Sequence, residues 1–278
     1  MASQQIAENL AFINWTVLTG LAIGSFAAVV LAAQRTEATR GFLAFTAACS
    51  TLLAVLAFVS DRALPATLGG SPIVTDPTFD TPRRIALGAF VVIDGAYTVA
   101  LARGRRATWL AAAGLVVAAL VLITAALSWG SGPFGAVPLL LQLGVLTIAT
   151  GGVFAAMILG HWYLVTPKLP EGPLILIARV LFIVVAVQLL LFAGWVATGA
   201  GPAGGAPFAV LVGPWALFVW LRLIVGLVFP LVVSYAAVRT ARTRSMESAT
   251  GLLYINVGSI AAGTILAAGL YFGAGLLV

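Results

Sequence analysis

LAFINWTVLTGLAIGSFAAVVLA, residues 10–32, is an apolar run of 23 residues without a charged side chain. A hydrocarbon core about 30 Å thick is crossed by about 20 apolar residues in helical form. Seven further runs are predominantly apolar and of similar length: 41–59, 84–103, 108–129, 138–165, 174–197, 214–238 and 251–277. The sequence therefore predicts an all-α, polytopic membrane protein with eight transmembrane helices, in which residues 1–278 form a single integral membrane domain.

The composition supports this prediction and excludes other classes of protein. Hydrophobic residues make up 62% of the chain and charged residues 8%, against about 25% charged residues in soluble domains. The net charge of +6 does not indicate nucleic-acid binding, because the basic residues are scattered at the ends of the apolar runs. We expect the lipid bilayer to be the main partner, and no nucleic acid.

The distribution of basic residues predicts the orientation, since cytoplasmic loops carry an excess of Lys and Arg. The N-terminal MASQQIAENL has no basic segment, so the first run is expected to be a membrane span and not a cleaved signal peptide. Nine basic residues lie in the joints after spans 1, 3, 5 and 7, namely Arg35, Arg40, Arg103, Arg105, Arg106, Lys168, Arg239, Arg242 and Arg244. On the opposite side three arginines are accompanied by three aspartates, namely Arg62, Arg83, Arg84, Asp61, Asp76 and Asp80. This pattern predicts a bacterial-type inner (cytoplasmic) membrane protein with both termini outside the cytoplasm.

Two parts of the sequence resemble each other. GSFAAVVL (24–31) is similar to GVFAAMIL (152–159), and Arg84, Gly88 and Tyr97 recur at the same spacing as Arg222, Gly226 and Tyr235. One interpretation is a pair of parallel four-helix repeats with halves 10–129 and 138–277. The other is chance similarity between segments rich in Ala, Gly and Val.

Asp94 and Arg222 are charged residues within the predicted spans, where such groups are costly and usually face the bundle interior. Asp94 is near the middle of the third span. It is a candidate proton relay, ligand contact or salt-bridge partner, or else a carboxyl that clips two helices together. Arg222 lies in the seventh span. It either extends to the headgroups or faces inward and binds an anion, a quinone carbonyl or Asp94.

The chain has one histidine and one cysteine. His161, in GHWYLVTPK at the end of the fifth span, is a candidate for hydrogen bonding or proton transfer at a quinone site, or an interfacial histidine in an aromatic belt. A bis-histidine haem cannot be built from one histidine. Cys49 alone cannot form a Cys-based metal or iron–sulfur site. No haem or metal is therefore expected from this chain alone.

Three segments resemble the haem-free membrane anchors of the polysulfide reductase and dimethyl-sulfoxide reductase family: TGLAIGSF (19–26), SDRALP (60–65) and GTILAAGLYFGAG (263–275). Such anchors bind a quinone and exchange electrons with an iron–sulfur partner. The resemblance implies that Asp61 and Arg62 lie close to a quinone near the outer face. The last span departs from the family, because it lacks the acidic residue and arginine usual there.

These observations predict an integral membrane subunit of a multisubunit respiratory electron-transfer complex. We expect it to anchor redox partners, including an iron–sulfur or cytochrome subunit, and not to be catalytic alone. A quinone would be the cofactor, and the candidate residues for binding it are Asp61, Arg62, Arg84, Asp94, Arg222 and His161. Two alternatives stay open: a small-solute or ion transporter or channel built around Asp94, and a purely structural membrane subunit.

Overall fold

The structure is a computed structural model that describes residues 2–166 and 169–278. Among these residues, eight helical segments are long and apolar enough to cross a membrane. They are α2 (Leu10–Arg35), α3 (Arg40–Arg62), α4 (Asp80–Ala102, preceded by the 3-10 turn η1, Pro77–Phe79), α5 (Thr108–Trp129), α6 (Pro133–Val165), α7 (Gly172–Thr198), the composite α8–η3–α9 and α10 (Met246–Ala274). The prediction of an all-α polytopic membrane protein with eight spans is confirmed.

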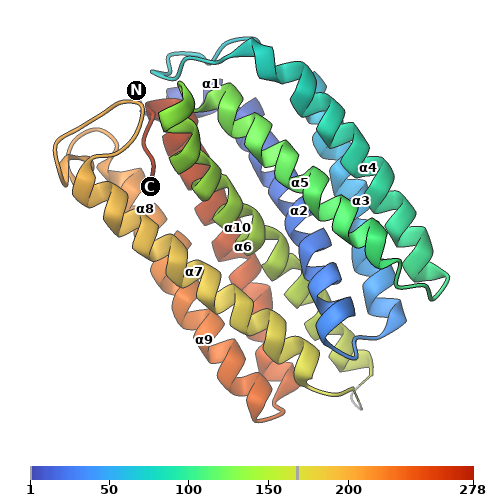
Figure 1. The fold of residues 1–278 in the computed structure, drawn as a ribbon. Coiled ribbons are helices and arrows are strands. Elements are labelled where there is room, and N and C mark those ends of the chain that lie inside the picture. The colour runs from blue at the N-terminus through green and yellow to red at the C-terminus, as the bar shows by residue number, and fades with distance from the viewer. Residues whose placement is uncertain (1, 167–168) are drawn as a thin grey trace.

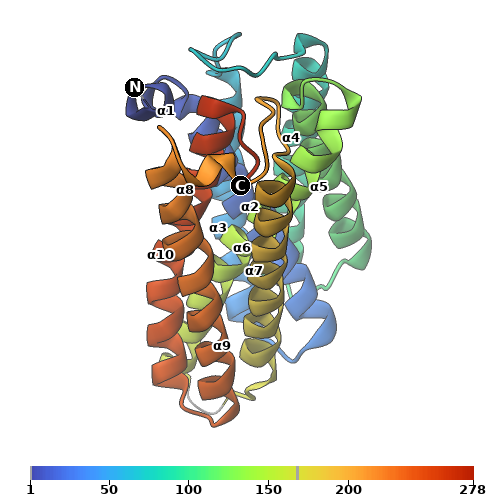
Figure 2. The ribbon, with the colours of Figure 1, turned by 90° about the vertical axis from the view of Figure 1, so that its left-hand side faces the viewer.

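The helices form a bundle with α2, α6 and α10 in its middle (Figure 1). Helices α3, α4 and α5 lie on one side of these three, and α7, α8 and α9 lie on the other, which faces the viewer in Figure 2. Helix α2 contacts α3, α6 and α10, and α6 contacts α2, α7 and α10. Helices α2 and α6 are the most buried spans, whereas α10 is partly exposed and the flanking helices expose large apolar side chains such as Leu52, Val92, Leu190 and Val232. These outward faces are suited to lipid.

Several helices extend beyond the predicted apolar runs. Helix α10 begins at Met246, five residues before the predicted run, and α9 continues to Arg242. Backbone hydrogen bonding continues where hydrophobicity stops, because helix formation is cooperative and does not require apolar side chains. The short helix α1 (Ala2–Glu8) was not expected. It is held to the loop after α3 by the amide of Asn9, which donates to the Gly69 carbonyl at 2.9 Å.

The span between Ala216 and Arg242 is broken. It consists of α8 (Ala216–Leu223), a π-helical segment η3 (Ile224–Val228) and α9 (Phe229–Arg242). Such π-bulges are rare and are frequent at functional sites.

The chain reverses direction at each joint, so the eight spans place both termini at the same end of the bundle (Figure 1). We call this the terminus end, and the opposite end the basic end. The joints at the basic end contain the arginines that the sequence grouped together; Lys168, of the same group, lies outside the described residues. Which end faces the cytoplasm stays a prediction.

The central contact of the bundle is the crossing of α2 and α6. A Cβ atom built on Gly24 would lie 2.9 Å from the Cα of Gly151. A Cβ atom built on Gly151 would in turn collide with the backbone of Gly24. The Ser25 hydroxyl donates to the Gly151 carbonyl at 3.3 Å. Small residues allow this approach, which replaces the hydrophobic effect as a source of helix association in lipid.

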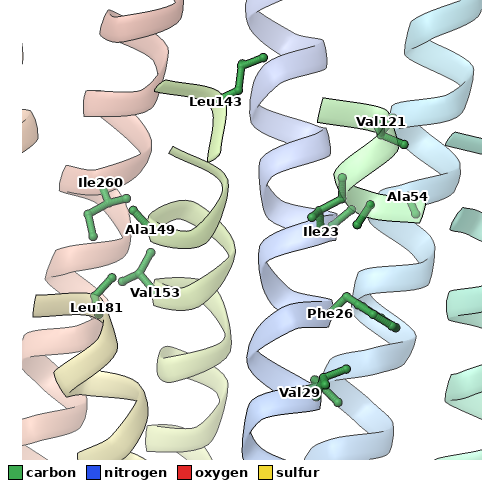
Figure 3. Packing of buried hydrophobic residues seen from close by; sticks show 14 of the residues in the cluster. Ile23, Phe26, Val29, Ala54, Val121, Leu143, Ala149, Val153, Leu181 and Ile260 are labelled. Carbon is green, nitrogen blue, oxygen red and sulfur yellow. The ribbon is translucent and has the colours of Figure 1, made fainter. Parts of the chain in front are cut away.

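The two segments that resemble each other in sequence meet at this crossing. Gly24 begins GSFAAVVL and Gly151 immediately precedes GVFAAMIL. The buried side chains around them form two groups (Figure 3). Ile23 of α2 lies near Val121 of α5, with Phe26 further along α2, and Ala149 and Val153 of α6 lie near Ile260 of α10. Duplication of a four-helix unit stays a prediction.

We predict that Gly151→Ala destabilises the protein by about 1–3 kcal/mol, because the added methyl group overpacks two backbones in contact. Gly152→Ala is the matched control, since a Cβ at Gly152 meets no atom within 4 Å. The control should be neutral or slightly stabilising, because alanine favours helices over glycine. Unfolding in mixed micelles measures both variants, and equal stabilities would contradict the importance of the crossing.

Candidate functional site

The six predicted site residues lie in four separate places. Asp61 and Arg84 are in contact at the terminus end, with Arg62 adjacent in sequence but exposed. Asp94 is ten residues further along α4 than Arg84, which is about 15 Å in a helix. Arg222 belongs to α8 and His161 to the last turns of α6. The structure therefore does not assemble them into one site.

An ionic cluster joins α3 and α4 at the terminus end. The buried Arg83 binds Asp61 (Nε to Oδ2, 2.7 Å) and Asp80 (Nη1 to Oδ1, 2.8 Å). Arg84, which is 41% exposed, binds the second oxygen of Asp61 at 3.1 Å. Two guanidinium groups thus meet two carboxylates. Asp61 and Arg83 are buried almost completely, and burial of such charges is tolerable only when each is paired and hydrogen-bonded.

The cluster extends to α5. Ser128 accepts from Arg83 Nη1 at 3.0 Å, and the Arg83 guanidinium lies 4.7 Å above the ring of Trp129. A pocket of about 120 Å³ opens beside it, lined by both arginines, Asp80, Trp129 and Phe12 together with residues of the loop after α3. The cluster offers guanidinium donors to a small polar group, but most of its donors are already engaged within the protein.

The loop before α4 is fixed by its own hydrogen bonds. The backbone N–H of Asp76 donates to the Ser128 carbonyl at 2.7 Å. The Asp76 carboxylate accepts from the backbone N–H of Thr78 at 2.9 Å and from its hydroxyl, and these bonds lower the pKa of Asp76. This N-terminal cap fixes the start of η1, which continues into α4, and so determines the position of Arg83 on α4.

We predict that Asp61→Asn destabilises the protein by about 3 kcal/mol, because it leaves the buried Arg83 with one counter-charge instead of two. Arg62→Ala is the control, since Arg62 is exposed and forms no ion pair with the described residues. It should change the free energy of unfolding by less than about 0.5 kcal/mol. A small effect of Asp61→Asn would mean that Asp80 alone balances Arg83.

Arg222 is buried and does not extend to the helix end, so the headgroup interpretation is wrong. Its Nη2 donates to Gln188 Oε1 of α7 at 2.7 Å, and its Nη1 donates to the Gly226 carbonyl at 3.1 Å. Gly226 and Gly263 make room for it, because a Cβ on either would lie within about 3.1 Å of Nη1. Asp94 forms no ion pair with Arg222, and among the described residues no carboxylate lies within salt-bridge distance of this arginine.

Pro230 explains this arrangement. It has no backbone N–H, so it cannot donate to the carbonyl of Gly226 in an α-helix or of Val225 in a π-helix. Arg222 donates to the Gly226 carbonyl, and the Ser259 hydroxyl of α10 donates to the Val225 carbonyl. Side chains therefore satisfy the backbone groups that the proline releases, as membrane helices require.

We predict that Ser259→Ala costs about 1 kcal/mol of stability, because the Val225 carbonyl loses its side-chain donor. The same substitution should cost less in a Pro230→Ala background, where a backbone N–H can take over. A double-mutant cycle of unfolding free energies measures the difference. Ser248→Ala, at an exposed position of the same helix, controls for helix propensity; equal costs in both backgrounds would contradict this explanation.

Asp94 is fully buried between α4 and α3. Its Oδ2 lies 2.7 Å from the Ser50 hydroxyl, which also lies 2.9 Å from the Ala22 carbonyl of α2. Its Oδ1 has no hydrogen-bond partner among the described residues. The beginning of α4 is thus held to α3 by ion pairs, and its later part by the contact of Asp94 with Ser50 and by that of the Thr98 hydroxyl with the Thr51 hydroxyl at 3.1 Å.

His161 lies at the basic end, away from the ionic cluster. Its Nδ1 lies 3.3 Å from the hydroxyl of Tyr254 on α10, and both side chains are exposed. The adjacent Tyr163 points inward instead and donates to the Pro170 carbonyl at 2.5 Å. A quinone shared between His161 and Asp61 is therefore excluded by their positions at opposite ends of the bundle.

A larger cleft lies on the lipid-facing side of α2, near the terminus end. Its volume is about 410 Å³ and its lining is mainly apolar: Leu10, Ala11, Ile13, Asn14, Val17 and Ile265. Asn14 supplies the polar group. Its Nδ2 donates to the Ser60 hydroxyl at 3.4 Å, next to Asp61 on α3. An exposed amide in a membrane span needs a further partner, because hydrocarbon offers none.

Sequence reasoning missed the contributions of Arg83, Asp80, Ser128 and Asn14. The spacing of Asp80 and Arg83, three residues apart on a helix, was a readable signal for their ion pair. Asn14 is an uncharged polar residue within the first apolar run, and its exposure cannot be read from one sequence. Among the described residues no cluster of His, Cys, Asp or Glu could hold a metal ion.

No protein-family model matches the chain, nor does any curated protein or solved structure. The resemblance to the polysulfide reductase anchors therefore stays a prediction. What the chain does must be inferred from its own geometry.

Proposed function

We propose that this polytopic membrane protein binds a quinone in the cleft beside Asn14, as the membrane subunit of an electron-transfer complex. The observation that carries the proposal is the cleft itself, which is lipid-facing and apolar and contains an amide. Its volume of about 410 Å³ falls in the range of small-molecule sites, which are mostly apolar with few polar groups.

The chemistry of the cleft suits both redox states of a quinone. One N–H of Asn14 is directed at Ser60, which leaves the second N–H to donate to a quinone carbonyl and the amide oxygen to accept from a quinol hydroxyl. Leu10, Val17 and Ile265 would surround the ring and the first part of its apolar tail. Ser60 connects this amide to Asp61 along α3, the residue that the family resemblance associates with a quinone.

Electron transfer would require a partner. A quinone gains or loses two electrons, and we expect these to come from an iron–sulfur or cytochrome subunit that binds this protein. The transporter alternative has less support, because the polar groups around Asp94 do not continue across the bundle. Towards the terminus end they give way to Ala54, Ala57, Leu87 and Phe90, all buried.

We predict that a photoreactive azido-quinone in nanodiscs labels the segment Leu10–Val17. Ile265→Trp should block labelling by filling the cleft, whereas Ile255→Trp, exposed on the same helix, should not. Asn14→Leu should weaken quinone binding several-fold, because one hydrogen bond of about 1 kcal/mol is lost.

A photoreactive lipid without a quinone ring provides the comparison. Labelling of the cleft by both probes to the same extent would show an ordinary lipid contact and would overturn the proposal. Equal labelling of the Ile265→Trp and Ile255→Trp variants would do the same.

A further inference from the structure

We propose that Asp94 is a proton-binding site: a neutral carboxylic acid inside the bundle whose proton exchanges only with the basic end. This inference is independent of the quinone cleft, which lies beside α2 near the terminus end. It rests on hydrogen-bond geometry and on the distribution of polar side chains along α3 and α4.

Hydrogen-bond counting favours the neutral acid. The Ser50 hydroxyl has one hydrogen but lies within hydrogen-bonding distance of two acceptors, Asp94 Oδ2 at 2.7 Å and the Ala22 carbonyl at 2.9 Å. An ionised Asp94 would compete with the carbonyl for this hydrogen. A protonated Asp94 donates to the Ser50 oxygen, and Ser50 then donates to Ala22. Both contacts are hydrogen bonds only in the second case.

The surroundings supply no compensating cation. Among the described residues no basic side chain lies within salt-bridge distance of Asp94. Helix α5 carries no ionisable residue, and α2 carries only Arg35, in its last turn. On α3 the ionisable group nearest to Ser50 in the sequence is Cys49, and on α4 the ionisable group nearest to Asp94 is Tyr97. An ionised carboxylate without a partner is far more costly to bury than a neutral one.

On α3 and α4 the buried polar side chains nearest to Asp94 lie towards the basic end. Asp94 is eight residues from the basic end of α4 and fourteen from the other end, or about 12 Å and 21 Å. Towards the basic end lie the buried Tyr97 of α4 and Thr46 of α3. The Thr46 hydroxyl, one turn from Ser50, has no partner among the described residues, and neither has Asp94 Oδ1.

Towards the terminus end the inner faces of α3 and α4 are apolar, whereas α2 contributes Thr19, a buried hydroxyl without a partner among the described residues. The buried residues between Ser50 and Asp61 on α3 are Ala54 and Ala57, and those between Arg83 and Asp94 on α4 are Ala86, Leu87 and Phe90. This layer separates Asp94 from the ionic cluster of Asp61 and Arg83. The proposed proton route therefore passes Thr46 and Tyr97, because α3 and α4 carry no buried polar side chain between Asp94 and the ionic cluster.

Dicyclohexylcarbodiimide tests the protonation state, because the O–H of a carboxylic acid adds across one C=N bond of this reagent, whereas a carboxylate is unreactive until protonated. In the intact protein in nanodiscs we expect a covalent mass increase on Asp94, slower at higher pH and lost in Asp94→Asn. Asp61 is an internal control: it is equally buried but ion-paired, and it should stay unlabelled. Labelling of Asp61 with Asp94 unlabelled would overturn the proposal.

Infrared spectroscopy provides a second measurement that does not depend on access by the reagent. The carbonyl band of a protonated carboxylic acid should disappear in Asp94→Asn, shift in Ser50→Ala, and move on transfer to D₂O. Thr46→Val should slow the deuterium shift, and the matched control Thr124→Val, on α5 away from this route, should not. A band that does not respond to D₂O, or that persists in Asp94→Asn, would overturn the proposal.

Discussion

The backbone contact between α2 and α6 is the constraint on which the rest of the bundle depends. At Gly24 and Gly151 the two helices approach so closely that a single methyl group does not fit. In lipid there is no hydrophobic gain from bringing apolar helices together, so close packing and interhelical hydrogen bonds must supply the association. Because α2 and α6 occupy the middle, their crossing sets where the flanking helices α3–α5 and α7–α9 can lie.

The polar groups of the bundle fall into two kinds. Arg83, Asp61 and Asp80 neutralise one another, and Arg222 and Ser259 donate to backbone carbonyls near Pro230, although Arg222 Nε has no partner among the described residues. Asn14 and Asp94 have a different setting: Asn14 is exposed in a membrane span, and Asp94 is a buried carboxyl group without an ion-pair partner among the described residues. Binding of a ligand or a proton is therefore better assigned to Asn14 and Asp94 than to the ion-paired Arg83 and Arg84.

The sequence was sufficient for the spans but not for the site. Runs of about 20 apolar residues define membrane helices regardless of their partners, so all eight could be predicted. Arg83 and Arg84 show which features the sequence does not predict: they are identical residues at adjacent positions, yet Arg83 is buried and Arg84 is 41% exposed. Their difference depends on the rotation of α4 about its axis, which packing against α3 and α5 decides. The i, i+4 spacing of Gly226 and Pro230 indicates that the Gly226 carbonyl lacks its backbone donor. The hydrogen bond from Ser259 could not be predicted, because Ser259 belongs to another helix.

The crossing of α2 and α6 also has a consequence for biosynthesis. The ribosome delivers α2 first, and α3, α4 and α5 are all made before the partner that covers its glycine face. During that interval Gly24 faces lipid or the insertion machinery, and the first half of the chain lacks the neighbour that completes its central helix. The N-terminal half alone is therefore an unfinished assembly, and the bundle closes only when its fifth span enters the membrane.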